Sequence, residues 1–125
     1  MLDSAKLIGF LFTTDYDKAK DFFVGKLGFR FVSLDQFGLV MRCGANMIRV
    51  SKIPNFTPAQ GTVLGWEVSN IEETLTSLTQ QGITAEQYPF MKDSAIWTAP
   101  SGDKVVWFKD PDGNILGVSQ HVSTA

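Results

Sequence analysis

The chain has 125 residues, of which 44% are hydrophobic and 19% are charged, and its formal net charge is −2. The 11 basic and 13 acidic residues are mixed along the sequence, which excludes a basic stripe for nucleic acid and an acidic disordered tail. A chain of this length buries about two-thirds of its unfolded surface, so we expect one ordinary soluble domain.

The single cysteine and the early apolar run bear on the compartment. Cys43 is the only cysteine, which excludes an intrachain disulfide framework and indicates a reducing compartment. The apolar run at residues 7–12 is too short for a signal-peptide core or a membrane span. We therefore expect a cytoplasmic protein with no nucleic-acid or membrane partner. Cys43 is interpreted as an inert buried thiol, and the only histidine, His121, as a surface residue.

The first half of the sequence predicts one helix among four strands. Residues 6–13 are rich in Leu, Ile and Phe, which is typical of a buried strand. Asp15 is a good N-cap for an amphipathic helix that ends near Gly28. Three further strands are expected at residues 29–34, 37–42 and 46–52.

The second half repeats this pattern after a break. Residues 53–61 contain two prolines and a glycine, so they form a connector and not a central strand. Asn70 is a second N-cap, with Glu73 in a capping-box position, for a helix that ends at Gly82. Strands are expected at residues 62–68, 83–87, about 95–98, 104–109 and 115–120, a loop at 88–93, and hairpin turns at 100–103 and 110–113.

The two halves are an internal repeat. Asp15 corresponds to Asn70 and Gly28 to Gly82, at offsets of 55 and 54 residues. A β-α-β-β-β unit buries one face of its sheet under its helix and leaves the other face free. Two such units can therefore surround a pocket with their free faces, and the repeat predicts an α+β fold of two tandem modules around a central cavity.

Three sequence segments carry a resemblance to a known superfamily. They are residues 15–23 followed by Leu27-Gly-Phe29, the repeat that begins at Val68-Ser-Asn70, and the turn Asp110-Pro-Asp-Gly-Asn114. With them, the whole chain resembles the vicinal oxygen chelate superfamily of glyoxalase I, bleomycin resistance proteins and extradiol dioxygenases. The resemblance implies a single domain over residues 1–125 with curved mixed sheets, and a homodimer. The first βαβββ module would span about 5–52, the linker 53–61 and the second module about 62–121.

The metal site of the catalytic members does not carry over to this sequence. Those members usually bind a divalent ion through His on the first strand of each module and Glu on a last strand. By position, these sites fall on Ile8, Arg49, Val63 and Gly117. Aliphatic, guanidinium and glycine positions supply no ligand, and a shift of one residue brings none. We therefore expect no metal and no cofactor, which disfavours glyoxalase-type isomerisation and extradiol cleavage.

Residues in phase with these positions are expected to line the cavity, because alternate strand residues share one face. The expected ligand-binding residues are Ile8, Phe10, Phe12, Met47, Arg49, Val63, Glu67, Phe108 and Gly117. The two phenylalanines of the first strand have an alternative interpretation as core residues, because aromatic residues at alternate strand positions are more often core than ligand platform. Arg49 and Glu67 could instead pair with each other or lie at the solvent edge.

The placement of Phe108 depends on the register of the last hairpin. If the turn at 110–113 pairs Lys109 with Asn114, Phe108 shares the face of Gly117. Trp107 then falls on the opposite face together with Trp66, where both would pack on the helix. Trp97 and Phe90 lie beside the loop at 88–93 and are expected at the rim of the pocket.

Three functions remain open from the sequence. The favoured one is a metal-independent binding protein that sequesters an aromatic or amphipathic compound such as an antibiotic, as bleomycin resistance proteins do, and not an enzyme. The alternative is a divergent lyase or isomerase, with a displaced metal or with Arg49 as anion anchor and Glu67 as general base. The third is a small dimerising domain whose cavity is filled by its own side chains.

Overall fold

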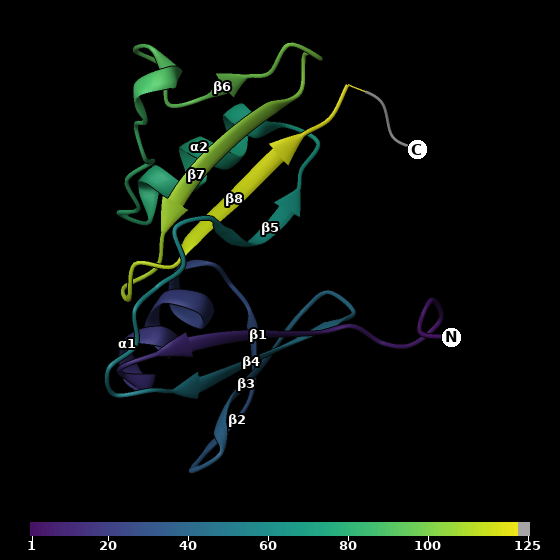
Figure 1. Ribbon diagram of the computed structural model, residues 1–125, viewed down its shortest axis with the longest axis vertical. Coiled ribbons are helices and arrows are strands. Elements are labelled where there is room, and N and C mark those ends of the chain that lie inside the picture. The colour runs from purple at the N-terminus through teal and green to yellow at the C-terminus, as the bar shows by residue number, and fades with distance from the viewer. Residues whose placement is uncertain (123–125) are drawn as a thin grey trace. The chain divides into compact units, whose positions relative to one another are not determined.

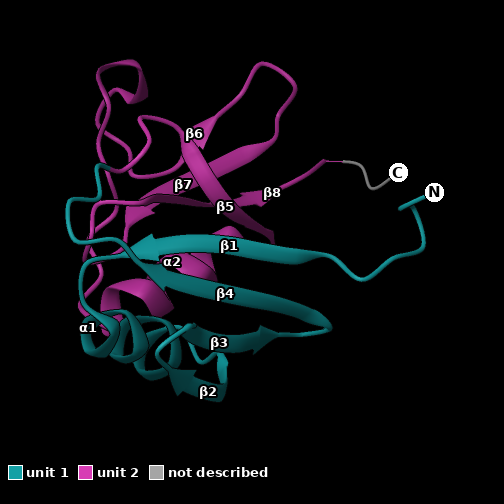
Figure 2. Ribbon diagram, turned by 60° about the horizontal axis from the view of Figure 1, so that its bottom comes forward, with its two compact units in different colours: residues 1–57 teal, residues 58–125 magenta. Residues whose placement is uncertain are grey.

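The computed structural model describes residues 1–122. The chain divides into two compact units, one of residues 1–57 and one from Pro58 onward, coloured teal and magenta in Figure 2. Each unit holds one four-stranded mixed sheet and a helical segment that follows its first strand. This confirms the predicted α+β fold of two βαβββ modules.

The first unit has the strand order β1-β4-β3-β2, with β1 parallel to β4 and the other neighbours antiparallel. Asp15 is the N-cap as expected, since its carboxylate accepts hydrogen bonds from the amides of Asp17 and Lys18 at 2.9 and 3.2 Å. The elements are β1 (Ile8–Thr13), α1 (Tyr16–Lys20), η1 (Asp21–Lys26), β2 (Arg30–Asp35), β3 (Gly38–Cys43) and β4 (Asn46–Lys52).

The first helix differs from its prediction in its second half. Residues 21–26 form a π-helical turn, which the 3.0 Å bond from the Leu27 amide to the Phe22 carbonyl closes. The two adjacent side chains Phe22 and Phe23 are both buried, with 5% and 1% of their surface exposed. The burial of both rings agrees with the predicted amphipathic helix, whereas a hydrophobic pattern with α-helical spacing does not predict the wider turn.

The second unit repeats the topology, with the order β5-β8-β7-β6 and β5 parallel to β8 (Figure 1). Gly28 and Gly82 follow the two helices with the same positive φ of 79°, a conformation that favours glycine. This equivalence agrees with the repeat in the sequence. The elements are β5 (Thr62–Glu67), α2 (Ile71–Gln80), η2 (Pro89–Met91), β6 (Trp97–Thr98), β7 (Lys104–Lys109) and β8 (Ile115–Gln120).

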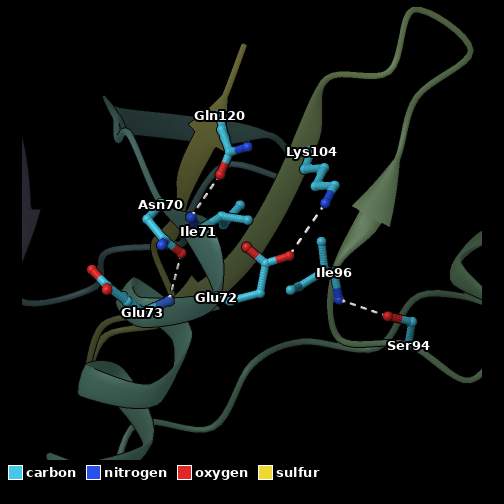
Figure 3. Close-up of polar contacts among 8 residues, drawn as sticks. All are labelled: Asn70, Ile71, Glu72, Glu73, Ser94, Ile96, Lys104 and Gln120. Carbon is cyan, nitrogen blue, oxygen red and sulfur yellow. Dashed lines mark hydrogen bonds and ion pairs between the residues drawn. The ribbon is translucent and has the colours of Figure 1, made fainter. Parts of the chain in front are cut away.

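The start of α2 is capped locally and is also bonded to strands of its sheet. The Asn70 side chain accepts a 3.1 Å hydrogen bond from the Glu73 amide, as its predicted N-cap role requires. Gln120, at the end of β8, accepts a second one at 2.8 Å from the Ile71 amide (Figure 3). Figure 3 also shows the ion pair of Glu72 with Lys104 on β7, at 3.2 Å.

The strand predicted at residues 83–87 is wrong. This segment is irregular, and a backbone hydrogen bond from the Glu86 amide to the Trp107 carbonyl at 2.7 Å joins it to the sheet. The short strand β6 pairs with β7 farther along, at Val105 and Lys104. Two separate segments therefore share this edge of β7, and the first makes too few ladder bonds to be a strand.

The last hairpin has a different register from the predicted one. Lys109 pairs with Ile115, not Asn114, and Phe108 therefore pairs with Leu116. The cause lies in the turn, where the Asp110 carboxylate accepts bonds from the Asn114 amide at 2.9 Å and from its side-chain amide at 2.7 Å. These bonds make Asp110 and Asn114 the closing pair. A shift of one residue exchanges the two faces of a strand.

Candidate functional site

In the second unit, one side of the β5-β8-β7-β6 sheet lies opposite the buried core. We call this side the second open face, because it belongs to the second unit. Gly65, Gly117 and Trp107 lie in one row across it, because Gly65 pairs with Gly117 and Gly117 with Trp107. Phe108 lies on the other side with 1% of its surface exposed, and its ring stacks on Trp66 at 6.1 Å. The structure thus places Trp107, and not Phe108, on the face of Gly117.

The indole of Trp107 covers the position of Gly117. A β-carbon built on Gly117 would lie 3.5 Å from Cδ1 and 3.6 Å from Nε1 of the indole. The Nε1 group donates a 3.0 Å hydrogen bond to Oγ1 of Thr62 on β5. This bond fixes the ring over two neighbouring strands.

A β-bulge in β5 brings Thr62 to this place. Thr62 pairs with Ile115 and Leu64 with Leu116, so Val63 is the extra residue. In the first sheet, Ile8 pairs with Met47 at the equivalent position. Thr62, and not Val63, is therefore the structural counterpart of Ile8, because the bulge shifts the register by one residue.

A cleft of about 280 Å³ opens beside the Trp107 indole. Its walls are mostly apolar, and the lining residues that carry polar side-chain groups are a threonine, a tyrosine and a glutamine. A mostly apolar wall with few polar groups is typical of small-molecule sites. The lining residues are Gln60, Gly61, Thr62, Tyr88, Phe90, Trp107 and Ile115.

Four aromatic rings build one wall of this cleft and its support. Tyr88 and Phe90 stack in parallel, with centroids 5.9 Å apart, and Trp107 meets both edge-on at 5.7 and 5.8 Å. Trp97 braces Phe90 at 5.5 Å and Trp107 at 5.9 Å. Phe90 keeps 56% of its surface exposed. Such edge-to-face and offset contacts stabilise aromatic clusters beyond the area they bury.

The Tyr88 hydroxyl is buried and has no hydrogen-bond partner among the residues that the structure describes. Burial raises the pKa of Tyr88, and the Glu86 carboxylate raises it further, whereas Lys109 acts against this. Glu86 and Lys109 form an ion pair at 3.4 Å. The phenol therefore stays neutral at physiological pH and can act as a hydrogen-bond donor.

The first sheet presents an apolar face of its own. Ile8, Phe10 and Phe12 alternate along β1 with 42%, 62% and 40% of their surface exposed. Met47 and Arg49 lie beside them on β4. The five residues predicted there therefore share one face of one sheet, and the first three are not core.

The predicted site residues of the second unit divide differently. Glu67 and Gly117 lie on the second open face, whereas Val63 occupies the bulge and Phe108 the core. The sequence analysis did not predict that Thr62, Tyr88 and Trp107 would lie together at the cleft. The sequence feature that could have placed Trp107 there is the Asp110–Asn114 pair, whose side-chain bonds set the register of the last hairpin.

The sequence model of the Glyoxalase/Bleomycin resistance protein/Dioxygenase superfamily matches residues 5–118. The chain belongs to this superfamily. No curated protein gives a significant match. No helix among the described residues is long and apolar enough to cross a membrane.

Several solved structures share the fold of this chain. A glyoxalase family protein from Enterococcus faecalis has 23% identity and a TM-score of 0.73, over 95% of this chain and 99% of that one. Lactoylglutathione lyase from Agrobacterium tumefaciens has 22% identity and a TM-score of 0.72, over 94% and 93%. TioX from Micromonospora sp. ML1 has 19% identity and a TM-score of 0.71, over 95% and 100%. Identities this low establish the fold alone.

The residues present do not fit the divalent metal that catalytic members of the superfamily bind. The corresponding positions are Ile8, Arg49, Thr62 in place of Val63, and Gly117. A guanidinium, a hydrocarbon and a glycine donate no lone pair, and a lone threonine hydroxyl is a weak ligand. Residues 1–122 contain no group of three or more His, Cys, Asp or Glu side chains that could hold an ion.

Proposed function

We propose that this member of the superfamily is a metal-independent protein that binds a small aromatic or amphipathic compound, such as an antibiotic, beside Trp107. The observation that carries the proposal is the position of the Trp107 indole. It covers Gly117, where a metal-binding glutamate would stand, and forms a wall of an apolar cleft. An aromatic wall offers stacking area to a planar ligand.

The cleft supports a ligand of modest size. Its volume of about 280 Å³ lies just below the usual range for small-molecule sites, which favours a system of one or two rings. The neutral hydroxyl of Tyr88 would donate a hydrogen bond to an acceptor on the ligand, after a small shift of the ring that exposes it. Such a bond is favourable because the hydroxyl is otherwise buried without a partner.

The apolar face of the first unit is proposed as a separate binding surface of that unit. Ile8, Phe10 and Phe12 expose aromatic and aliphatic area, and Arg49 on the neighbouring strand adds a cation. Glu67 on the second open face is proposed as a polar contact. Residues 1–125 would act as one domain, as a homodimer, in the cytoplasm.

The fluorescence of a bound probe tests the proposal with a matched pair of variants. The probe is 8-anilinonaphthalene-1-sulfonate, a planar amphipathic compound whose emission rises in apolar sites. We expect saturable binding that Trp107→Ala weakens by about tenfold, because a stacked aromatic contact contributes about 1 kcal/mol or more. Trp66→Phe is the control, since Trp66 stacks on Phe108 in the core. Equal affinities in both variants would contradict the proposed site.

Metal analysis separates this function from the enzyme alternative. We expect the purified protein to contain no stoichiometric zinc, nickel, iron or manganese, and EDTA to leave probe affinity unchanged. A bound metal at one equivalent would instead favour a lyase or isomerase with a displaced site. For a metal-free enzyme based on Arg49 and Glu67, Glu67→Gln tests the base, because the amide cannot accept a proton.

A further inference from the structure

A polar cluster lies on the second open face, outside the aromatic cleft. Ser119 on β8 places its Oγ 2.8 Å from Nε2 of His121. Nδ1 of the same imidazole lies 3.6 Å from Oδ2 of Asp103, in the turn between β6 and β7. The side chains of His121 and Asp103 are 39% and 31% exposed, so the cluster is open to solvent and to a substrate.

A backbone hydrogen bond orients the carboxylate of this cluster. The Val122 amide donates a 2.9 Å hydrogen bond to Oδ1 of Asp103, which leaves Oδ2 toward the imidazole. In the tautomer with the proton on Nδ1, which faces the carboxylate at 3.6 Å, Nε2 accepts the proton of the Ser119 hydroxyl. The groups then follow one another in the order carboxylate, imidazole, hydroxyl, an order that activates a serine nucleophile in hydrolases of unrelated folds once the first contact shortens to a hydrogen bond.

We propose that Ser119, His121 and Asp103 form a nucleophilic site that hydrolyses small activated carboxylic esters. Ser119 Oγ attacks the ester carbonyl carbon while Nε2 of His121 takes the hydroxyl proton. The ester C–O bond breaks, and the imidazolium gives that proton to the departing alkoxide or phenoxide. Water then cleaves the acyl-serine with His121 as general base, which releases the acid and restores Ser119. This site does not depend on ligand binding in the aromatic cleft.

The location of Ser119 limits the range of substrates. The serine lies within a strand, where the amides serve the sheet ladders, and not on a sharp turn that directs amides at an oxyanion. Loss of one oxyanion donor costs about 10²–10³ in rate in serine hydrolases. The site is therefore suited to esters with good leaving groups, such as aryl esters, and not to amides.

The first unit supplies a matched control within the same molecule. Ser51 pairs with Phe12 on β1 just as Ser119 pairs with Glu67 on β5, so the two serines hold equivalent places in the two sheets. Two residues after Ser51 stands Ile53, where His121 stands in the second unit. Ser51 therefore lacks the imidazole in its own strand that would activate it.

The test uses the whole protein and p-nitrophenyl acetate. We expect release of p-nitrophenolate above the buffer rate, together with one acetyl group that peptide mass spectrometry places on Ser119. Ser119→Ala should return the rate to that of buffer, and His121→Gln should lower it by about 100-fold. Ser51→Ala should leave the rate unchanged. Urea unfolding of each variant shows whether it is folded, so a loss of rate in a folded variant is a loss of chemistry.

Three results would overturn the proposal. One is acetylation confined to lysines or to the N-terminus, and another is a rate that Ser119→Ala does not change. The third is hydrolysis that needs His121 but not Ser119, since the imidazole would then be the nucleophile itself. If Trp107→Ala does not change probe affinity, only the proposed binding site in the cleft is contradicted. The proposal of ester hydrolysis at Ser119 is tested independently.

Discussion

The indole of Trp107 lies against the backbone of Gly117, with Cδ1 3.5 Å from the point where a β-carbon would stand. The two residues are direct partners on β7 and β8. The space that a metal-binding carboxylate side chain would need at position 117 is therefore occupied by an aromatic ring. This contact supports the metal-independent binding that we propose for this chain.

Position 117 should accept a methyl group but not a carboxylate. Alanine places its β-carbon at ordinary contact distance from Trp107, so we expect Gly117→Ala to be neutral or to stabilise by up to about 1 kcal/mol. Gly117→Glu must displace the indole from Thr62, at a cost of about 1–3 kcal/mol. Urea unfolding measures both, and metal analysis should still find no bound ion in the glutamate variant.

Gly65 is the matched control for this pair. A β-carbon there would lie 3.1 Å from the carbonyl oxygen of Gly117, and backbone within a sheet yields less than a side chain. We expect Gly65→Ala to destabilise the protein by about 1 kcal/mol or more. Equal unfolding free energies for Gly65→Ala and Gly117→Ala would contradict the expectation that a β-carbon is crowded at Gly65 and accommodated at Gly117.

The hydrogen bond between Trp107 and Thr62 should hold the wall of the cleft in place. Thr62→Val keeps the shape of the side chain and removes the acceptor of the indole N–H. We expect a loss of about 0.5–1.5 kcal/mol of stability and weaker binding of the anilinonaphthalene probe. Val63→Thr, the same exchange reversed at the bulge residue, should leave probe affinity unchanged. A larger loss of probe affinity for Val63→Thr than for Thr62→Val would contradict the β5–β8 register, in which Val63 is the bulge residue.

The Asp110 carboxylate should make stability depend on pH. Burial raises its pKa above the ordinary 3.8, although bonds from the side chain and backbone of Asn114 and the backbone of Asp112 act in the opposite direction. The folded protein then holds the Asp110 proton more tightly than the unfolded chain. Its contribution to stability is full below pH 3.8 and is lost as the pH rises through the folded-state pKa.

Unfolding of Asp110→Ala isolates this contribution. We expect the variant to be less stable by about 2 kcal/mol, because it leaves the turn amides unpaired, and the deficit to shrink as the pH rises above 4. Asp35→Ala is the control, since the Asp35 carboxylate accepts a turn bond from the Phe37 amide at 2.8 Å in an exposed place. A larger loss for Asp35→Ala, or a deficit that grows with pH, would contradict the assignment.

Gln120 should be a second cap of α2. Its Oε1 accepts a hydrogen bond from Ile71, which is completely buried. We expect Gln120→Ala to cost about 1–2 kcal/mol, since the amide loses its partner. Gln120→Glu keeps an acceptor and adds a charge that suits a helix N-terminus, so its unfolding midpoint in urea should stay near that of the wild type. Equal losses in the two variants would show that the acceptor is unimportant.

The sequence predicted most strands and both helix starts because their signals are local. Asp15 and Asn70 cap the amides of the next turn, and each needs only its neighbours in the chain. The segment at 83–87 had the composition of a strand but failed as one, because a strand needs a partner along its length. That partner is decided by the rest of the sheet.

The two-module fold, the helix caps and the kind of side chain at the inherited metal positions follow from the sequence, since they depend on residue type and near neighbours. Which faces the strands present depends on how the strands pair in the folded sheets. The side-chain bonds between Asp110 and Asn114 set one register and the bulge at Val63 set another. With a period of two residues, each one-residue step exchanges the faces of a strand. The one-residue step in the last hairpin buries Phe108 and places Trp107 against Gly117.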